Sequence, residues 1–328
     1  MSATTTAMSV VAAVAPVTRR VRAYFAPVNR ATGTPTVFDA AQMGTFALST
    51  PPAPWVDLGW CAKFARRSET RVAALTAGAP AVVQSQVRSQ VEATVQLEFE
   101  SWGKLQLALA SGSQQMNLLQ TASGAAANGS GGLAAAAVPL IAGSTATSLS
   151  VGATAAAQFQ VGELVAVDED YLAQMGFVGS GVSAAYVSSP ASVGSDVNYV
   201  RRVTLNVGRV VGITGGVLQL DGALQAGAPS SGMQVSRLAG FVDREGGGFF
   251  QEWSGLFVMD GEQGDRVIYH YPRLQSMQGS AETVEALARP LERVRLAGAF
   301  RALPVKDAND GETVLCFRSY LPAPTRAV

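Results

Sequence analysis

The sequence is poor in charged residues and nearly free of histidine. Charged side chains make up only 15% of the 328 residues, and 24 basic residues balance 24 acidic ones. Because the formal net charge is zero, no global field recruits nucleic acid or an anionic membrane. The single histidine, His270, has no serine or cysteine nucleophile motif beside it, so we expect a strand side chain there and a protein that is not an enzyme.

Cysteine and long apolar runs are also scarce. Cys61 and Cys316 lie far apart in the sequence, which excludes a disulfide framework and a CxxC metal site and favours assembly in a reducing cytosol. No apolar run approaches the length of about 18 residues that a membrane span needs. The basic pair Arg19-Arg20 follows the apolar opening residues, whereas the basic region of a signal peptide precedes its apolar region. The opening residues therefore make a poor signal peptide. We expect no membrane insertion.

Three short motifs resemble ligand-binding sites, but each is more simply interpreted as a turn or loop. Asp168-Glu169-Asp170 could bind a hard cation, although consecutive acids point in different directions and an acidic turn is commoner. The stretch from Gly179 to Ala184 matches the dinucleotide pattern GxGxxA, but the residues after it cannot open a useful helix, so a glycine loop is favoured. Asp307 to Glu312 is predicted to be a hairpin turn. We therefore expect no catalytic, cofactor-binding or metal residues and no cofactor.

The strongest pattern is an unbroken alternation from Val83 to Phe99. Odd positions are apolar or small and even positions are polar, which predicts a strand with one face on a core and one in water. At about 3.3 Å per residue the strand would span roughly 55 Å, far beyond the usual length. Its partner is expected within Phe64 to Leu75, with the tip at Ala77 to Pro80. The polar side chains are Gln84, Gln86, Arg88, Gln90, Glu92, Thr94, Gln96 and Glu98.

The remaining chain divides by composition. A helix is predicted over about Glu100 to Ala110, and residues 121–137 are rich in small residues, which is typical of a flexible linker. Residues 138–238 show short strands with glycine turns and are interpreted as an inserted small β-barrel or sandwich. Strands return over residues 239–328, so residues 1–120 and 239–328 are predicted to form one unit. The fold class is mostly β, with a minor helical part.

Tryptophan-containing segments and the terminal strands suggest a family. A Trp-Val-Asp-Leu-Gly-Trp segment at Trp55 to Trp60 is followed by an Arg-rich strand, the long alternating strand and a Trp-led helix ending in Met116 to Leu119. The chain closes with a hairpin ending in Phe317 to Pro322. This arrangement resembles the tail tube proteins of tailed bacteriophages over about residues 15–120 and 240–325.

The resemblance implies a two-sheet β-sandwich or barrel with a long hairpin and one helix, assembled as hexameric rings stacked into a tube. The hairpin would contribute to an inner barrel, and its polar face would line a channel for double-stranded DNA passing without sequence-specific binding. Trp55, Trp60 and Trp102 are expected in subunit contacts, and residues 138–238 outside the tube. The implied partners are further copies, a tape measure protein and other tail proteins, in a virion tail assembled in the bacterial cytoplasm.

Two alternatives stay open. The first is a related tail part, such as a terminator or baseplate ring protein, which fits the same pattern. It stays open because Arg88 is a basic residue where a tail tube channel would be expected to have a neutral or acidic lining. The second alternative is a carbohydrate- or cell-surface-binding module, which the inserted β domain and aromatic residues such as Tyr171 and Tyr186 support. An enzyme is the least favoured class.

Overall fold

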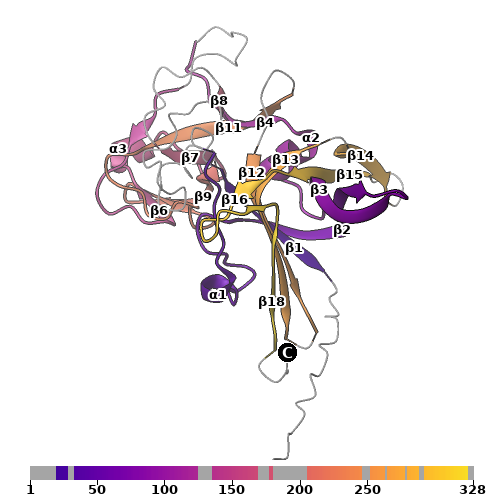
Figure 1. Ribbon diagram of the computed structural model, residues 1–328. Coiled ribbons are helices and arrows are strands. Elements are labelled where there is room, and N and C mark those ends of the chain that lie inside the picture. The colour runs from indigo at the N-terminus through magenta and orange to yellow at the C-terminus, as the bar shows by residue number, and fades with distance from the viewer. Residues whose placement is uncertain are drawn as a thin grey trace, which may run out of the picture.

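Antiparallel β-structure dominates the chain, which confirms the mostly-β prediction. The structure is a computed structural model in which residues 20–28, 33–124, 135–168, 177–179, 205–245, 252–262, 264–277, 279–287 and 292–323 are described. Within them two 8-stranded sheets and one small hairpin account for the strands (Figure 1).

The first sheet curls into a closed barrel. Its order is β14-β15-β3-β2-β1-β12-β13-β18, and an additional pairing of β13 with β15 closes the circuit. The two outermost strands extend beyond the closure. The strands are β1 (Val21–Pro27), β2 (Val56–Ala77), β3 (Val82–Phe99), β12 (Glu252–Asp260), β13 (Arg266–Ser276), β14 (Ala281–Ala286), β15 (Glu292–Ala302) and β18 (Phe317–Leu321).

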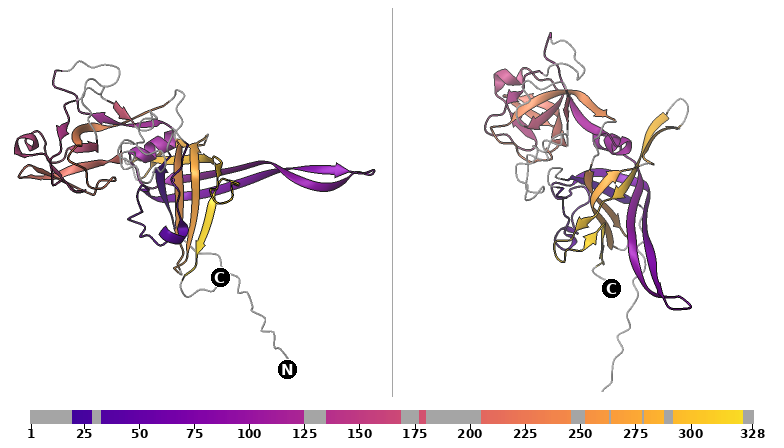
Figure 2. Two further views of the ribbon diagram at one scale, coloured as in Figure 1. Left: turned by 60° about the vertical axis from the view of Figure 1, so that its left-hand side comes forward. Right: turned by 45° about the horizontal axis from the view of Figure 1, so that its top comes forward.

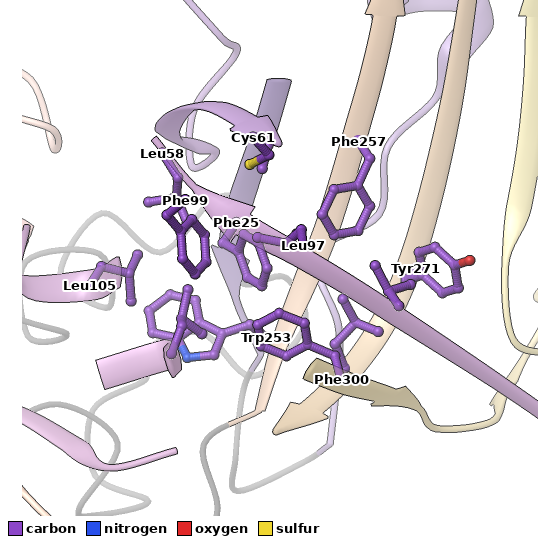
Figure 3. Packing of buried hydrophobic residues seen from close by; sticks show 14 of the residues in the cluster. Phe25, Leu58, Cys61, Leu97, Phe99, Leu105, Trp253, Phe257, Tyr271 and Phe300 are labelled. Carbon is purple, nitrogen blue, oxygen red and sulfur yellow. The ribbon is translucent and has the colours of Figure 1, made fainter. Parts of the chain in front are cut away.

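Aromatic side chains fill the barrel interior. The ring of Phe25 lies 5.9 Å from that of Phe257 and 5.5 Å from that of Phe300, and Trp253 packs into the same cluster (Figure 3). Large buried rings supply most of the apolar area that such a core removes from water. The alternation of β3 delivers its side chains to this core, as described below.

Helix α2 (Lys104–Ser111) packs on the barrel core through Leu105 and Leu109. It starts later than predicted and ends at Gly112, whose left-handed backbone (φ 67°) lets its N–H bond to the carbonyl of Ala108. The helix does not continue to Leu119. That expectation is wrong, because residues Gln114–Leu119 form strand β4 instead.

A second layer covers the outer face of β1, β12 and β13. It contains the short helix α1 (Ala40–Met43), whose first turn is capped by the side chain of Asp39. Apolar residues of the layer pack on outward-facing residues of these strands, with Phe38 and Trp55 against Leu256. The barrel therefore has packed side chains inside and on part of its outside.

The second sheet forms a separate unit with its own core. Its order is β6-β10-β9-β7-β11-β4-β8, with β5 also paired to β11. The cluster around Leu149, Val210 and Leu218 is fully buried. The elements are β5 (Val138–Pro139), β6 (Ser148–Ser150), α3 (Ala153–Ala156), β7 (Leu164–Asp168), β8 (Phe177–Gly179), β9 (Val207–Thr214), β10 (Val217–Leu220) and β11 (Gln234–Arg244).

The boundaries of this unit differ from the predicted 138–238. Strand β4, which precedes the predicted linker, pairs along β11, and β11 runs on to Arg244. No local sequence pattern predicts this pairing, because it joins strands separated by more than a hundred residues. Residues 125–134 of the linker lie outside the described residues, as do Glu169, Asp170 and residues 180–184 of the two ligand-like motifs.

The predicted turn near Asn309 is confirmed. It joins β16 (Val305–Lys306) to β17 (Thr313–Val314) in a two-stranded hairpin between β15 and β18. Asp307 accepts a hydrogen bond from the backbone N–H of Asn309 at 2.9 Å, and Gly311 has a positive φ of 76°. Both features are typical of tight turns.

Candidate assembly surface

The ends of β2 and β3 leave the barrel as a two-stranded arm. Residues 68–77 and 82–91 are exposed on both faces, and the turn between them lies at residues 78–81, which confirms the predicted hairpin and tip. Figure 2 shows this ribbon projecting far from the barrel. At about 3.3 Å per residue, the ten exposed residues of each strand span roughly 33 Å.

One face of the arm is apolar, and we call it the apolar arm face. Cross-strand pairs place Ala73 beside Val87, and Leu75 beside Ser85, on the same side. Each large apolar side chain here is about half exposed, although such residues are normally buried. Those side chains, with their exposed fractions, are Leu75 (55%), Val82 (53%) and Val87 (50%). Register shifts between Arg71 and Val72 and between Leu75 and Thr76 turn Val83 and Val91 to the other side of the ribbon.

The prediction that the odd positions of β3 lie on a core holds only near the barrel. Ala93, Val95, Leu97 and Phe99 are buried in the barrel cluster. Val91 and the odd positions before it face no other part of the described chain closely enough to be covered. The same alternation therefore serves an internal core at one end and an open surface at the other.

A groove lies at the base of the arm, on the side of Val91 and Arg88. The groove has a volume of about 700 Å³ and lies between the arm and the segment around β16 and β17. Val91 and Ala93 line one side, and Leu303, Val314 and Leu315 line the other. Arginine side chains, including Arg66 and Arg318, border it. Its mixed lining is suited to a protein segment, since interfaces combine an apolar centre with a polar rim.

The face of β3 opposite Val91 carries five of the eight predicted channel-lining side chains, which are Gln90, Glu92, Thr94, Gln96 and Glu98. The prediction of one shared face is wrong for Gln86 and Arg88, because the register shift between Arg71 and Val72 turns them to the side of Val91. Gln84 to Gln90 lie on the arm, whereas Glu92, Thr94, Gln96 and Glu98 lie where β3 joins the barrel sheet. Register extends this face across β2, β15 and β14, because Gln96 pairs with Ala65 on one side and Ala299 on the other. We call this four-strand surface the polar sheet face.

Ion pairs tie the polar sheet face together. Glu98 binds Lys63 of β2 at 2.6 Å and Arg295 of β15 at 2.7 Å. Arg295 also binds Glu285 of β14 at 2.5 Å, and Arg293 binds the same carboxylate at 2.9 Å. Hydrogen bonds from these two guanidinium groups, that of Arg295 first, lower the pKa of Glu285. The network crosses three strand boundaries.

Neighbouring strands make the polar sheet face basic. Strands β2 and β15 add arginines, so that basic side chains outnumber acidic ones there. The basic side chains are Lys63, Arg67, Arg71, Arg293, Arg295 and Arg301, and the acidic ones are Glu69, Glu92, Glu98 and Glu285. The period-2 spacing of Arg293, Arg295 and Arg301 within LERVRLAGAFRA could have revealed the contribution of β15.

The three tryptophans predicted in subunit contacts occupy different environments. Trp55 is 2% exposed inside the protomer, edge-on to Phe38, so its side chain is not available to a neighbouring subunit. Trp60 is partly exposed and covers the guanidinium of Arg22, 5.1 Å from its ring centre. Trp102 is 64% exposed. Only Trp102 presents a large open surface.

His270 is a buried strand residue, as the sequence analysis favoured. Its ring stacks on Phe317 at 5.7 Å and meets Trp55 edge-on at 5.8 Å, while Nε2 donates to the carbonyl of Thr36 at 3.3 Å. Burial lowers the pKa of His270 from 6.5 to about 4, because the charged imidazolium would lose its hydration there. The side chain is neutral at pH 7 and contributes to packing.

Acidification should destabilise the protein through His270. Because the folded-state pKa is lowered, the unfolded chain gains a proton first, so stability is complete above pH 6.5 and falls as the pH approaches 4. We expect urea unfolding at pH 5 to give a free energy about 2 kcal/mol lower than at pH 7. His270→Phe should remove that part of the pH dependence. An unchanged dependence in the variant would contradict the assignment.

The described residues contain no group of three or more His, Cys, Asp or Glu side chains that could hold a metal ion. Among the helices of this same part of the chain, none is long and apolar enough to cross a membrane. Cys61 and Cys316 are both free thiols, and burial raises the pKa of each. The most distinctive surface of the described chain is thus the arm and its two faces.

Comparison with known proteins gives no relative. No protein-family model matches the chain, and no curated protein matches it.

Proposed function

We propose that the protein is a structural subunit of a phage tail tube that forms stacked hexameric rings around a DNA channel. The observation that carries the proposal is the arm, a long ribbon with one exposed apolar face and no cover from its own chain. An isolated two-stranded ribbon is marginally stable in water. A neighbouring copy that covers the apolar arm face would remove both the exposed area and the open strand edges.

The polar sheet face supports a channel lining. It crosses four neighbouring strands, is hydrophilic throughout the predicted positions, and has its acids engaged in ion pairs within the protomer. Arg71 stands on the arm portion of this face, beside Gln90. Its charge would attract DNA phosphates, so we expect contacts with the passing duplex to weaken as salt rises.

The second sheet supports a position outside the tube. It has its own hydrophobic cluster and meets the barrel near α2, on the side away from the arm (Figure 2). A ring built through the arms would therefore leave this unit free of the channel. The tape measure protein, other tail proteins and the virion location remain part of the proposal through the family resemblance.

Electron microscopy of the purified full-length protein at high concentration tests the proposal. We expect rings of six copies that stack into tubes with a central channel. Closed rings that never stack would favour a terminator or baseplate part instead. Protein that remains monomeric at all concentrations would overturn the assembly proposal altogether.

A further inference from the structure

The amine of Lys104 and the amide of Asn117 meet where the barrel joins the second sheet. Lys104 is the first residue of α2, and Asn117 lies in the middle of β4. The Nζ atom of Lys104 is 2.7 Å from Oδ1 of Asn117. Since a C=O bond is only about 1.23 Å long, the amide carbon lies close to the amine as well.

The surroundings favour the neutral, nucleophilic form of the amine. Burial lowers the pKa of Lys104 well below its usual value. Its place in the first turn of α2 adds to this, because a positive charge is unfavourable at the N-terminal end of a helix dipole. The ring of Phe241, 5.2 Å from Nζ, covers the amine on another side.

The side-chain amide of Asn117 is buried, and its nitrogen makes no hydrogen bond within the described residues. Asn117 is 0% exposed, and its Nδ2 has no hydrogen-bond partner within the described residues. A buried amide nitrogen without a partner costs free energy, so its retention here calls for an explanation. A pocket of about 300 Å³ lined by Lys104, Leu58, Val207 and Phe241 adjoins the pair, which gives a small leaving group a way out.

We propose that Lys104 and Asn117 form an intramolecular isopeptide bond. The amine nitrogen attacks Cγ of Asn117, a new C–N bond forms, and the original bond from Cγ to Nδ2 breaks. One amine proton moves to the departing nitrogen, which leaves as ammonia, so the step needs no oxidant, reductant or other co-reactant. The bond would join α2, which packs on the barrel, to β4 of the second sheet. This inference does not depend on the proposed function.

Intact-mass measurement of the full-length protein tests the proposal. We expect a mass about 17 Da below that of the sequence, equal to the loss of one ammonia. Chymotryptic cleavage at the leucines between the two residues, Leu105, Leu107 and Leu109, should leave two peptides that remain joined. A protein with the full sequence mass, after allowance for removal of the first methionine, would overturn the proposal.

Variants distinguish a covalent isopeptide bond between Lys104 and Asn117 from a hydrogen bond between them. Lys104→Arg keeps a long nitrogen-bearing side chain beside Phe241 but has no amine that can form the bond, and Asn117→Ala removes the amide. Both variants should show the full sequence mass and separate peptides. Lys63→Arg, at a lysine paired with Glu98 outside the site, should keep the mass loss. Ammonia loss that persists in Lys104→Arg would place the reaction elsewhere and overturn the assignment.

Discussion

Leu97→Glu is expected to unfold the protein, whereas Val91→Glu, three odd positions earlier in the same strand, should leave it folded. Leu97 is 2% exposed among the aromatic residues of the barrel, where a carboxylate would be buried without a partner. Such burial should cost at least about 4 kcal/mol, a large part of the stability of an ordinary domain. Val91 is 47% exposed, so a charge there stays in water.

The contrast arises because β3 leaves the barrel between the two positions. Circular dichroism and urea unfolding measure it directly, with the change at Val91 expected within about 0.5 kcal/mol. If Leu97→Glu cannot be purified, Leu97→Ala should still fold, with a loss of about 2–5 kcal/mol. Equal losses at the two positions would show that the arm is packed against its own chain.

Val87→Glu is expected to abolish assembly without affecting the fold. Val87 lies in the centre of the apolar arm face, paired with Ala73 and half exposed. A carboxylate there would have to be dehydrated when a neighbouring copy covers the face, and burial of an unpaired charge is strongly unfavourable. We expect monomeric protein with an unchanged unfolding free energy.

Gln86→Glu is the matched control, because it adds the same charge at the adjacent position on the opposite face of the ribbon. Because the side chain at this position is already polar and exposed, this variant should still form rings. Sedimentation velocity and electron microscopy of both variants beside the unmodified protein decide the point. Assembly that survives Val87→Glu, or that is lost equally in both variants, would contradict the assignment of the two faces.

The hairpin could be predicted from the sequence because its signals are local. An alternation of apolar and polar residues has a side-chain period that only a strand satisfies, and Gly78-Ala79-Pro80 marks the tip. The short strands of the second sheet, such as Val217–Leu220, were found for the same reason. Helix α2 was also predicted, with its end displaced by only one residue.

Pairings between distant segments could not be predicted in this way. The addition of β4 to the second sheet, and the closure of the barrel by β13 and β15, depend on contacts that no local pattern records. The basic excess of the polar sheet face has the same origin. It arises because register places arginines of β2 and β15 beside the glutamines of β3.

The sequence by itself determined that the chain is mostly β and that β2 and β3 form one long hairpin. Tertiary structure alone decided where that hairpin leaves the barrel, so that Val95 is buried while Val91 is open. It also decided that Trp55 belongs to the protomer's own core and that Lys104 meets Asn117. The physical reason is that periodicity sets the direction of a side chain, whereas burial depends on what distant part of the chain arrives to cover it.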